Sequence, residues 1–542
     1  MKKKKTKMMK KFSILQFCLM IGLAIFITSC SSDNEATGKS KPNVLFVSID
    51  DLNDWIHPLK GHAQAITPNL DKLTNSGVLF TNAHCSQAVC TASRSSLLSG
   101  IRPSTSGWYY GTKSYKENYD EVMKDHHMLP EYFKNNGYNT YAVGKIFHRG
   151  ESDFPDKTDS YWTEYAPHFW DNMEKHIKEN GYGYGGGMFY PFPENGGKLL
   201  QLYKLNDSLK HFVNDVKHSL TGGPVEGDEI PEKGMYDEQI AEWAIKKINE
   251  KHNKPFFLSV GFVRPHVPYT APKKYFDMYD PEKLNMPVVP ENEMEDIPEF
   301  GKAIAHGNYT PRGGWYDVHQ IPGYWRELVH SYLACVTFVD DQLGKVISAL
   351  KESGQWDNTI IVLWSDHGQH LGEKRHFRKM ALWEESTRVP MYFKMPGDKN
   401  AGKSVKQVVS LLDIYPTLTD LSGLPKPNKL EGTSLIPLLD NPSTIWKKPV
   451  INTWYYKNHA IRSNNWRYIR YRDGSEELYD HRNDPGEHIN LAGNPEYADV
   501  IAEHKKWLPK NDALPSGMNE WNGDKFERML EAWNDSIPVW LR

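Results

Sequence analysis

The sequence predicts an α/β fold, with a mainly parallel β-sheet between helices and a smaller C-terminal subdomain built on an antiparallel sheet. Three short, almost wholly apolar runs end in polar residues, which is typical of strands buried on both faces of a parallel sheet; they lie within 43–49, 254–266 and 358–368. Helical patterns occur between such runs, for example Tyr236–Lys251, whose apolar side chains share one face. Alternating strands and helices predict a mainly parallel sheet.

The C-terminal part has a different pattern. Residues 460–493 alternate between apolar and polar residues on either side of the turn-forming pair Asp473-Gly474, which predicts antiparallel strands. We expect the arginines of this stretch to lie on a surface hairpin, away from any functional site: Arg462, Arg467 and Arg470. Two other segments are too long to be plain connections and are expected to be loops that shape a pocket: 181–197 and 286–322.

The N-terminal residues resemble a bacterial lipoprotein signal. Seven lysines lie within the first 11 residues, an apolar run follows to about Thr28, and small residues precede Cys30. Cleavage would leave Cys30 lipidated and attached to the membrane; an uncleaved transmembrane anchor is the alternative. Either arrangement places the body in the bacterial periplasm or at the cell surface. The predicted division is a signal peptide (1–29), a tether (30–42), a main domain (43–442) and a C-terminal subdomain (443–542).

Charge and composition restrict the class of partner. The chain has a formal net charge of −3, with 39% hydrophobic and 25% charged residues, which are ordinary values for a globular protein. Loss of residues 1–29 removes seven lysines and no acids, so the mature protein would carry a charge of −10. A net negative protein has no general attraction for polyanions, and this argues against nucleic acid as a partner.

Beyond the tether the chain has three cysteines, Cys85, Cys90 and Cys335, too few for a disulfide scaffold in a large exported body. Cys335 lies in an apolar helical pattern and is expected in the core, while a bridge between Cys85 and Cys335 stays open. Cys90 begins a helical pattern that Gly100 ends, and the N-terminus of a helix favours an anion. From the residues alone, Cys90 is either a reactive thiolate or a buried core residue.

Polar side chains follow three predicted strands at the end where ligands bind in open α/β sheets: Asp50 and Asp51, Arg264 and His266, and Asp366 and His367. A single acidic residue in such a place is often a helix cap or a turn residue. Adjacent carboxylates at a buried strand end repel one another, however, and a cation relieves that cost. The pattern predicts a site for Ca²⁺ or Mg²⁺, while His367 leaves Mn²⁺ or Zn²⁺ open.

The stretch "CTASR" at Cys90 matches the Cys-x-Ala/Pro-Ser-Arg motif of the type I sulfatases, which the chain resembles over nearly all of its mature length. Further family-like blocks, in family order, are "NVLFVSIDDLND", "GYNTYAVGKIFHRG", "PFFLSVGFVRPHVPY" and "IIVLWSDHGQHLGEK". The stretches "SQAVCTASR" and "VGKIFHRG" resemble the iduronate-2-sulfatase-like subgroup. The resemblance implies an alkaline-phosphatase/sulfatase-like fold, with residues 43–442 as the catalytic domain.

The resemblance also implies a set of cofactors and roles. A formylglycine-generating or anaerobic sulfatase-maturating enzyme would convert Cys90 to formylglycine (3-oxoalanine). One Ca²⁺ would be held by an oxygen of the modified Cys90 and by Asp50, Asp51, Asp366 and His367. Among the other catalytic residues, Arg94 would steady the formylglycine hydrate, and His266 would face the bridging oxygen. Lys145 and His148 would hold the sulfate and assist the aldehyde, and Lys379 would bind a sulfate oxygen. Two positions depart from the family pattern: Ile101 replaces an arginine, which puts modification efficiency in doubt, and His367 replaces an asparagine of many relatives.

The implied reaction is hydrolysis of a sulfate ester. A hydroxyl of the hydrated aldehyde would attack sulfur while the metal and the cationic side chains stabilise the developing charge, and His266 would protonate the leaving alkoxide. The second hydroxyl would then expel sulfate. The expected substrate is a sulfated polysaccharide or its oligosaccharides: an algal polysaccharide such as ulvan, carrageenan or fucoidan, attacked from a chain end, or iduronate-2-sulfate in a glycosaminoglycan.

Two other classes of protein share part of this pattern. A phosphatase or phosphodiesterase of the same superfold would use Ser or Thr at position 90 and more metal ligands for a second ion. An inactive, glycan-binding lipoprotein would be expected to have lost part of the ligand set. The cysteine at position 90 argues against the first class, and the complete set of ligands argues against the second.

Overall fold

A nine-stranded, mostly parallel β-sheet lies at the centre of the structure, a computed structural model that describes residues 41–109, 112–148, 157–166, 222–230, 232–307, 318–319 and 322–516. Its strands are β1 (Asn43–Ile49), β2 (Val78–His84), β3 (Asn139–Gly144), β4 (Glu164–Tyr165), β6 (Phe256–Phe262), β8 (Thr359–Ser365), β11 (Arg388–Lys394), β12 (Lys403–Val405) and β13 (Val409–Ser410). They lie in the order β12-β2-β11-β8-β1-β6-β3-β4, and β13 also pairs with β2. Only β11 runs antiparallel to its neighbours, β8 and β2. The predicted α/β class is confirmed.

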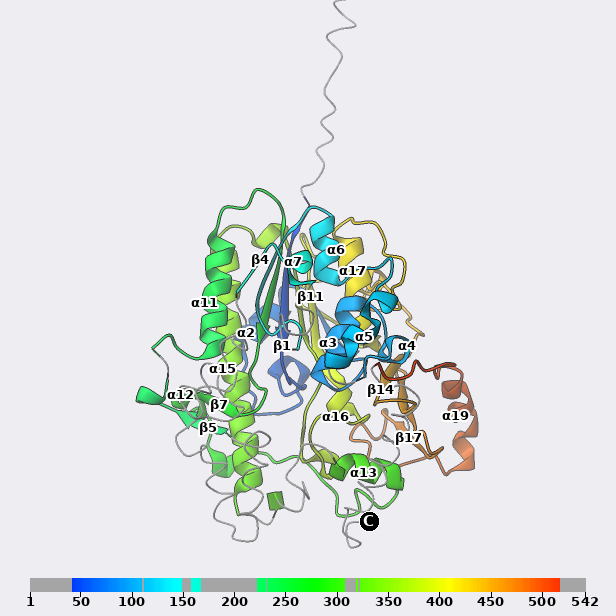
Figure 1. Cartoon of the computed structure of the whole chain (residues 1–542). Coiled ribbons are helices and arrows are strands. Elements are labelled where there is room, and N and C mark those ends of the chain that lie inside the picture. Colours follow the sequence, from blue (N-terminus) through cyan, green and yellow to red (C-terminus); the bar gives the residue numbers. More distant parts are fainter. Residues whose placement is uncertain are drawn as a thin grey trace, which may run out of the picture. The chain divides into compact units, whose positions relative to one another are not determined.

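Helices cover both faces of this sheet (Figure 1). The α-helices of the described residues are α2 (Pro68–Thr74), α3 (Cys90–Ser99), α4 (Pro103–Ser106), α5 (Thr112–Val122), α6 (Leu129–Asn135), α7 (Thr158–Tyr161), α11 (Tyr236–Asn249), α12 (Lys273–Phe276), α13 (Glu299–Gly307), α15 (Tyr324–Glu352), α16 (Glu384–Thr387), α17 (Ile414–Leu421), α18 (Ile436–Asp440) and α19 (Ala498–Lys505). Leu45 and Val47 of β1 share one core with α2, α11 and α15, whereas Val44 and Phe46 share another with α3, α6 and α17. Every residue of β1 is buried because helices cover both faces.

A separate antiparallel sheet follows near the C-terminus. Its strands, in spatial order, are β14 (Val450–Thr453), β15 (His459–Arg462), β16 (Trp466–Arg470) and β17 (Glu476–Asp480). Asp473-Gly474 forms the predicted turn between β16 and β17, and Gly474 adopts a φ of 96° that favours glycine. Two small sheets pair β5 (Gly222–Val225) with β7 (Tyr269–Pro272) and β9 (His370–Leu371) with β10 (Phe377–Arg378). The domain boundary at residues 442 and 443 stays a prediction.

The expected surface position of the arginines in this sheet is wrong for two of them. Arg462 and Arg467 are buried, whereas the Arg470 side chain is 37% exposed. The buried pair can leave water because both guanidinium groups form ion pairs with Glu384 of α16. A second correction concerns the predicted loop 286–322, which contains helix α13. The predicted loop 181–197 lies outside the described residues.

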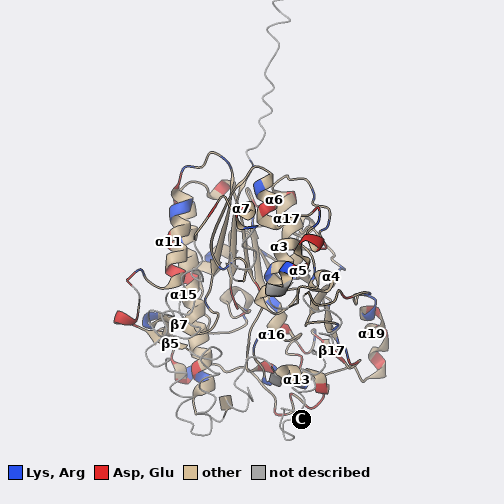
Figure 2. Cartoon of the chain, in the orientation of Figure 1, with Lys and Arg blue, Asp and Glu red and all other residues tan. Residues whose placement is uncertain are grey.

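The three cysteines of the body are buried and free. Cys85 belongs to the core beside α3, and Cys335 of α15 belongs to the core on the opposite face of the sheet, so the bridge left open above does not form. The predicted signal and most of the tether lie outside the described residues. Among the residues the structure describes, no helix is both long and apolar enough to cross a membrane. Figure 2 shows that outer helices such as α6, α11 and α19 carry both acidic and basic residues.

Candidate active site

The polar residues expected at the strand ends meet at one edge of the central sheet. Ile49, the last residue of β1, pairs with Phe262 of β6 and with Ser365 of β8, so the residues that follow these strands emerge at the same level. Asp51 has a left-handed φ of 59°, and its backbone N–H donates to Asp366 Oδ1 at 3.1 Å. The chain beyond β1 is therefore held directly against the chain beyond β8.

Arg94 lies between the carboxylates of this edge. Its Nε donates to Asp366 Oδ2 at 2.9 Å and its Nη2 donates to Asp50 Oδ1 at 3.1 Å. Its Nη1 donates to the backbone oxygens of Lys145 and Ile146. The predicted role of Arg94 at a modified Cys90 stays a prediction. What its contacts establish is that a fully buried guanidinium orients two of the predicted metal ligands.

Cys90 is the first residue of α3, which Gly100 ends with a φ of 73°. The thiol is buried, and its Sγ lies 3.2 Å from His367 Nε2, 3.3 Å from Lys379 Nζ and 4.0 Å from Asp51 Oδ1. The N-terminus of a helix adds the positive end of the helix dipole. The candidate nucleophile therefore has a cationic surrounding, with the three carboxylates of the metal set close by.

Each of the adjacent carboxylates has its own lysine partner. Lys145 follows β3 and its Nζ contacts Asp50 Oδ2, while Lys379 follows β10 and its Nζ lies 2.5 Å from Asp51 Oδ1. Both lysines are buried. The structure thus brings the two predicted sulfate-binding lysines to the same edge of the sheet from separate parts of the chain.

The two predicted catalytic histidines also reach this edge. His266 Nδ1 lies 2.7 Å from the Val267 carbonyl oxygen, and because a carbonyl only accepts, Nδ1 carries the hydrogen. The His266 ring has a nitrogen within 4.8 Å of ligand atoms of Asp50, Asp51 and Cys90. His148 lies close enough to the Cys90 side chain to lower the pKa of its thiol. Both histidines are therefore placed where proton transfer at a group on residue 90 is possible.

The electrostatics of the site favour a charged Cys90. Burial raises the pKa of the Cys90 thiol, whereas the charges of Lys145, Lys379 and His367 lower it. The effect of the charges is the larger, so the pKa lies well below its usual range. Burial lowers the pKa of His367, but Asp366 and its neighbours raise it to about 9. Burial raises the pKa of Asp366 to about 7 in spite of the nearby Arg94. A divalent cation would favour the ionised form of that carboxyl group.

The residues at this edge fit a divalent cation. Two overlapping groups have ligand atoms within 4.8 Å of one another: Asp50, Asp51, Cys90 and His266, and Asp50, Cys90, Asp366 and His367. Asp51 Oδ2 is buried and has no hydrogen-bond partner among the described residues, so one carboxylate oxygen is available to a ligand. Carboxylate oxygens are the ligands that Ca²⁺ prefers. All five predicted metal ligands lie together, and His266, which the sequence predicted at the same edge of the sheet as a catalytic residue and not as a metal ligand, lies beside them.

The sequence did not predict the residues that hold the backbone of the site in place through hydrogen bonds. Tyr332 of α15 donates its hydroxyl to the Asp51 carbonyl at 2.8 Å and accepts from the Asn53 N–H. Ser93 of α3 donates to the Asp366 carbonyl at 2.5 Å. Arg264, expected at the site, donates instead to the His266 carbonyl at 3.2 Å and to Thr270. No sequence signal marks the helical residues, because the inward face of a helix has the same pattern whether it supports a site or only packs.

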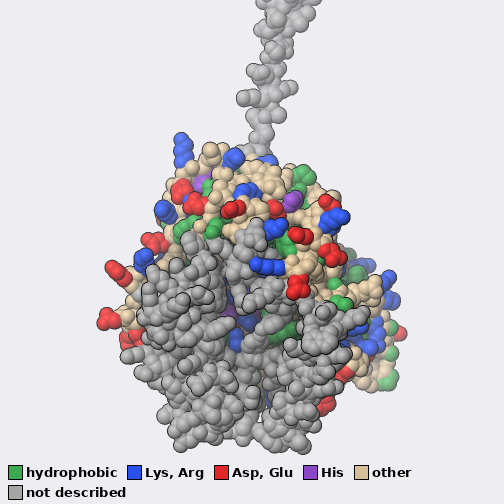
Figure 3. All heavy atoms as spheres, viewed as in Figure 1, with side chains coloured by type: hydrophobic (Ala, Val, Ile, Leu, Met, Phe, Trp, Pro, Cys, Tyr) green, Lys and Arg blue, Asp and Glu red, His purple; other side chains and the backbone are tan. Residues whose placement is uncertain are grey.

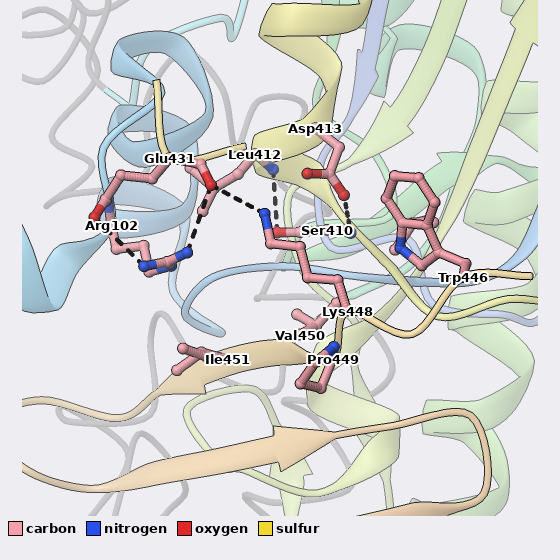
Figure 4. A pocket seen from close by; sticks show the side chains of 11 residues that line it. Arg102, Ser410, Leu412, Asp413, Glu431, Trp446, Lys448, Pro449, Val450 and Ile451 are labelled. Atoms are coloured by element: carbon pink, nitrogen blue, oxygen red, sulfur yellow. Dashed lines mark hydrogen bonds and ion pairs between the residues drawn. The ribbon is translucent and has the colours of Figure 1, made fainter. Parts of the chain in front are cut away.

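Figure 3 shows Lys or Arg and His side chains close together near the middle of the view. A pocket lies beyond the C-terminal end of α3 (Figure 4). Its charged side chains already have partners: Arg102 pairs with Glu431 at 3.4 Å, and Lys448 Nζ donates to the Glu431 carbonyl and to Thr433. None of the predicted site residues lines this pocket.

Comparison with known families gives two matches. The sequence profile described as Sulfatase matches residues 42–424. A second profile, described as N-sulphoglucosamine sulphohydrolase, C-terminal, matches residues 372–513.

Individual proteins show the same similarity. A sulfatase of Formosa agariphila is 38% identical over 506 residues, which cover 92% of each chain. The iduronate 2-sulfatase of Mus musculus is 31% identical over 76% of this chain and 74% of its own, and an ulvan-active sulfatase of Formosa agariphila is 28% identical over 92% and 87%. Among solved structures, the phosphonate monoester hydrolase of Agrobacterium radiobacter superposes with a TM-score of 0.65 over 86% of this chain and 94% of its own, at 22% identity. This last similarity concerns the fold.

Proposed function

The chain belongs to the sulfatase family and is a sulfuric ester hydrolase; from this premise we propose that it is an exported enzyme that removes sulfate from a sulfated polysaccharide or its oligosaccharides. The observation that carries the mechanism is the surrounding of Cys90. Its Sγ lies at a helix N-terminus, 3.3 Å from Lys379 Nζ and 3.2 Å from His367 Nε2. A single nucleophilic position is thus surrounded by groups that bind an anion.

We propose that Cys90 is converted to formylglycine by a formylglycine-generating or anaerobic sulfatase-maturating enzyme. The hydrated aldehyde supplies an oxygen nucleophile that a thiol does not. The motif "CTASR" supports this proposal. His148, which lies close enough to the Cys90 side chain to lower the pKa of its thiol, would take a proton from a group on residue 90 and return it.

Asp50, Asp51, Asp366, His367 and the modified Cys90 would hold one Ca²⁺, which would polarise a bound sulfate group and lower the pKa of a coordinated hydroxyl. Arg94 keeps Asp50 and Asp366 in place through its Nη2 and Nε. The unpartnered Asp51 Oδ2 supports the assignment of a cation at this edge.

The cationic side chains would bind the sulfate itself. Lys145 and Lys379 are buried, and both form ion pairs with carboxylates of the metal set. Because the two lysines are already held in place, they would bind a sulfate group with little reorganisation. His266 would donate the proton that a sugar alkoxide needs as it leaves. Its Nδ1–H is occupied by the Val267 carbonyl, so the proton given to the alkoxide would come from Nε2 of the doubly protonated ring and leave a neutral imidazole with its hydrogen on Nδ1.

The relatives support a carbohydrate substrate. One is named an iduronate 2-sulfatase and another an ulvan-active sulfatase. We propose an algal polysaccharide, attacked from a chain end, with glycosaminoglycan iduronate-2-sulfate as the alternative. The signal-like residues 1–30 support export to the periplasm or cell surface and a lipid anchor at Cys30.

The proposal is tested on protein isolated from its native host. Mass spectrometry of the peptide that contains Cys90 should find the aldehyde, and the same preparation should release sulfate from a panel of defined algal and glycosaminoglycan oligosaccharides. An unmodified thiol in active protein would reject the formylglycine step. Sulfate release at internal positions of an intact polymer would reject attack from the chain end.

A further inference from the structure

The segment that carries Lys379 is held by the C-terminal sheet. We define the Lys379 segment as residues 372–384, from Gly372 to the first residue of α16. Lys379 Nζ reaches Asp51 Oδ1 at 2.5 Å and Cys90 Sγ at 3.3 Å. Beyond these contacts the segment has little regular structure before α16, since β10 is two residues long and the helical turn within the segment covers three residues. Something else must fix its path.

The backbone of the Lys379 segment adopts conformations that a free chain avoids. Four of its non-glycine residues have left-handed φ values: Lys374 (56°), Arg375 (48°), Arg378 (74°) and Met380 (74°). Two of these directly flank Lys379. Such conformations persist only where the surrounding structure determines them, so the direction of the Lys379 side chain depends on the contacts of the residues around it.

Arg467 of β16 supplies the most concentrated set of these contacts. Its Nη1 donates to the Leu382 carbonyl at 2.6 Å, its Nη2 donates to Glu384 Oε2 at 2.5 Å, and its Nε donates to Glu487 Oε1 at 2.5 Å. Glu487 Oε2 in turn accepts the Glu384 N–H at 2.9 Å. Leu382 is only three residues beyond Lys379, so one fully buried guanidinium fixes the chain close to the catalytic lysine.

The charges of this cluster balance one another, which excludes a simple metal site. Glu384, His481 and Glu487 have ligand atoms within 4.8 Å of one another, but Arg462 and Arg467 both form ion pairs with Glu384. The apolar contacts agree with a holding function. Met380, Leu382 and Trp383 share a core with Ile469 of β16 and with Ala92 of α3, so the C-terminal sheet packs against both the Lys379 segment and the helix that begins at Cys90.

We propose that Arg467 is a positioning residue for Lys379: through Leu382, Glu384 and Glu487 it holds the Lys379 ammonium against Asp51 and Cys90. The C-terminal sheet then takes part in sulfate binding without contacting substrate. This inference rests on the sulfate-binding role proposed above for Lys379.

The test compares the change Arg467→Lys with Arg470→Lys in the mature enzyme. Lysine keeps the charge at position 467 but cannot reach three acceptors in the fork geometry of a guanidinium. Arg470 lies on the same strand, pairs with Glu476 at 2.7 Å and is partly exposed. We expect kcat/KM on nitrophenyl sulfate to fall by about 10- to 100-fold for Arg467→Lys, the cost of a displacement of roughly 1 Å in a catalytic group, and by less than about twofold for Arg470→Lys.

A double mutant separates positioning from general stability. In a Lys379→Ala background, Arg467→Lys should cause little further loss of kcat/KM, because the group that it positions is gone. The same pattern should appear in the dissociation constant of inorganic sulfate measured by calorimetry. Multiplied losses in the double mutant, or unchanged sulfate affinity in Arg467→Lys, would overturn the proposal.

Two further outcomes are decisive. If the wild-type protein binds sulfate through Lys379 but hydrolyses no sulfate ester, the proposed function is wrong. The dissociation constant of inorganic sulfate, measured for the wild type and for Arg467→Lys, then still tests the positioning role of Arg467. If Arg467→Lys does not fold, the isosteric change Glu487→Gln replaces it, with the same comparisons and a melting curve. Loss of the fold in both variants would assign the cluster to global stability and reject the positioning role.

Discussion

His266 gives the sharpest test of the proposed mechanism. A sugar alkoxide is a poor leaving group and needs a proton as the S–O bond breaks, whereas nitrophenolate leaves without one. We therefore expect His266→Ala to lower kcat/KM on a sugar sulfate by roughly 10²- to 10⁴-fold and to have a much smaller effect on nitrophenyl sulfate. At about 1.36 kcal/mol for each factor of ten, the expected loss corresponds to about 2.7 to 5.4 kcal/mol of transition-state stabilisation.

Part of any loss could come from the structure around His266. His266 Nδ1 donates to the Val267 carbonyl at 2.7 Å, and an alanine would leave this buried oxygen unpaired, at a cost of about 1 to 3 kcal/mol. His266→Asn is the matched control, because its side-chain amide can donate at a similar position but cannot carry the catalytic proton. If proton donation is the role, the asparagine variant should lose activity on the sugar sulfate as the alanine variant does.

The assay measures kcat/KM for both variants on both substrates, with Lys379→Ala as a reference. Lys379 would bind the sulfate common to the two substrates, so its loss should lower both rates. An equal loss on the two substrates for His266→Ala would refute the acid role. Recovery of sugar-sulfate turnover in His266→Asn would show that His266 shapes the site only.

The remaining predictions concern the nucleophile, the metal and the fold. Cys90→Ala should abolish turnover in a sulfate-release assay and leave the melting curve unchanged, because a small side chain at a helix start contributes little core volume. Asp366→Asn should weaken the Ca²⁺ affinity measured by calorimetry and remove activity, and added Ca²⁺ should restore part of that activity. The metal assignment would be contradicted if the wild-type protein kept full activity after a chelator had been shown to remove the metal. Asp340→Ala should lower the free energy of unfolding in urea by about 2 to 3 kcal/mol, because the Asp340 carboxylate of α15 accepts the first N–H groups of α2, at Asn69 and Leu70; a loss below about 0.5 kcal/mol would contradict that role.

The parts of the fold that the sequence predicted are those with a local signal. Residues 43–49 form β1 because a continuous apolar run is buried on both faces, and Gly100 ends α3 because it adopts a left-handed φ of 73°. The strand-end residues Asp50 and Asp366 also meet as expected, since parallel strands present the same end to one edge of the sheet. Periodicity and strand direction were sufficient for these predictions.

The parts that the sequence did not predict depend on contacts between distant residues. Arg467 looked like a surface residue because arginine is rarely buried, and only its ion pairs with Glu384 and Glu487 allow it to lie inside. The cap of α2 is similar, since Thr67 at its start makes no side-chain cap and Asp340 supplies one from another helix. A single sequence contains no record of such partners.

The balance of charge in the site determines which substitutions can report on chemistry. The carboxylates of Asp50 and Asp51 are attached to Lys145 and Lys379, and Asp366 is attached to Arg94, so each buried charge has a partner before any ion or substrate arrives. This arrangement avoids the desolvation cost of an isolated charge. It also means that removal of Asp50 or Asp51 leaves Lys145 or Lys379 buried without its carboxylate, at a cost of about 3 to 5 kcal/mol.

Changes at the lysines and aspartates therefore mix stability with catalysis. His266 and Cys90 lie beside this charged set but are not members of these three pairs. Substitutions at these two positions remove a proton donor or a nucleophile and leave the paired charges in place. The charged neighbours of His266 are unchanged in a His266 variant. A comparison of kcat/KM between a sugar sulfate and nitrophenyl sulfate in that variant therefore separates the chemistry of the leaving group from the stability of the site.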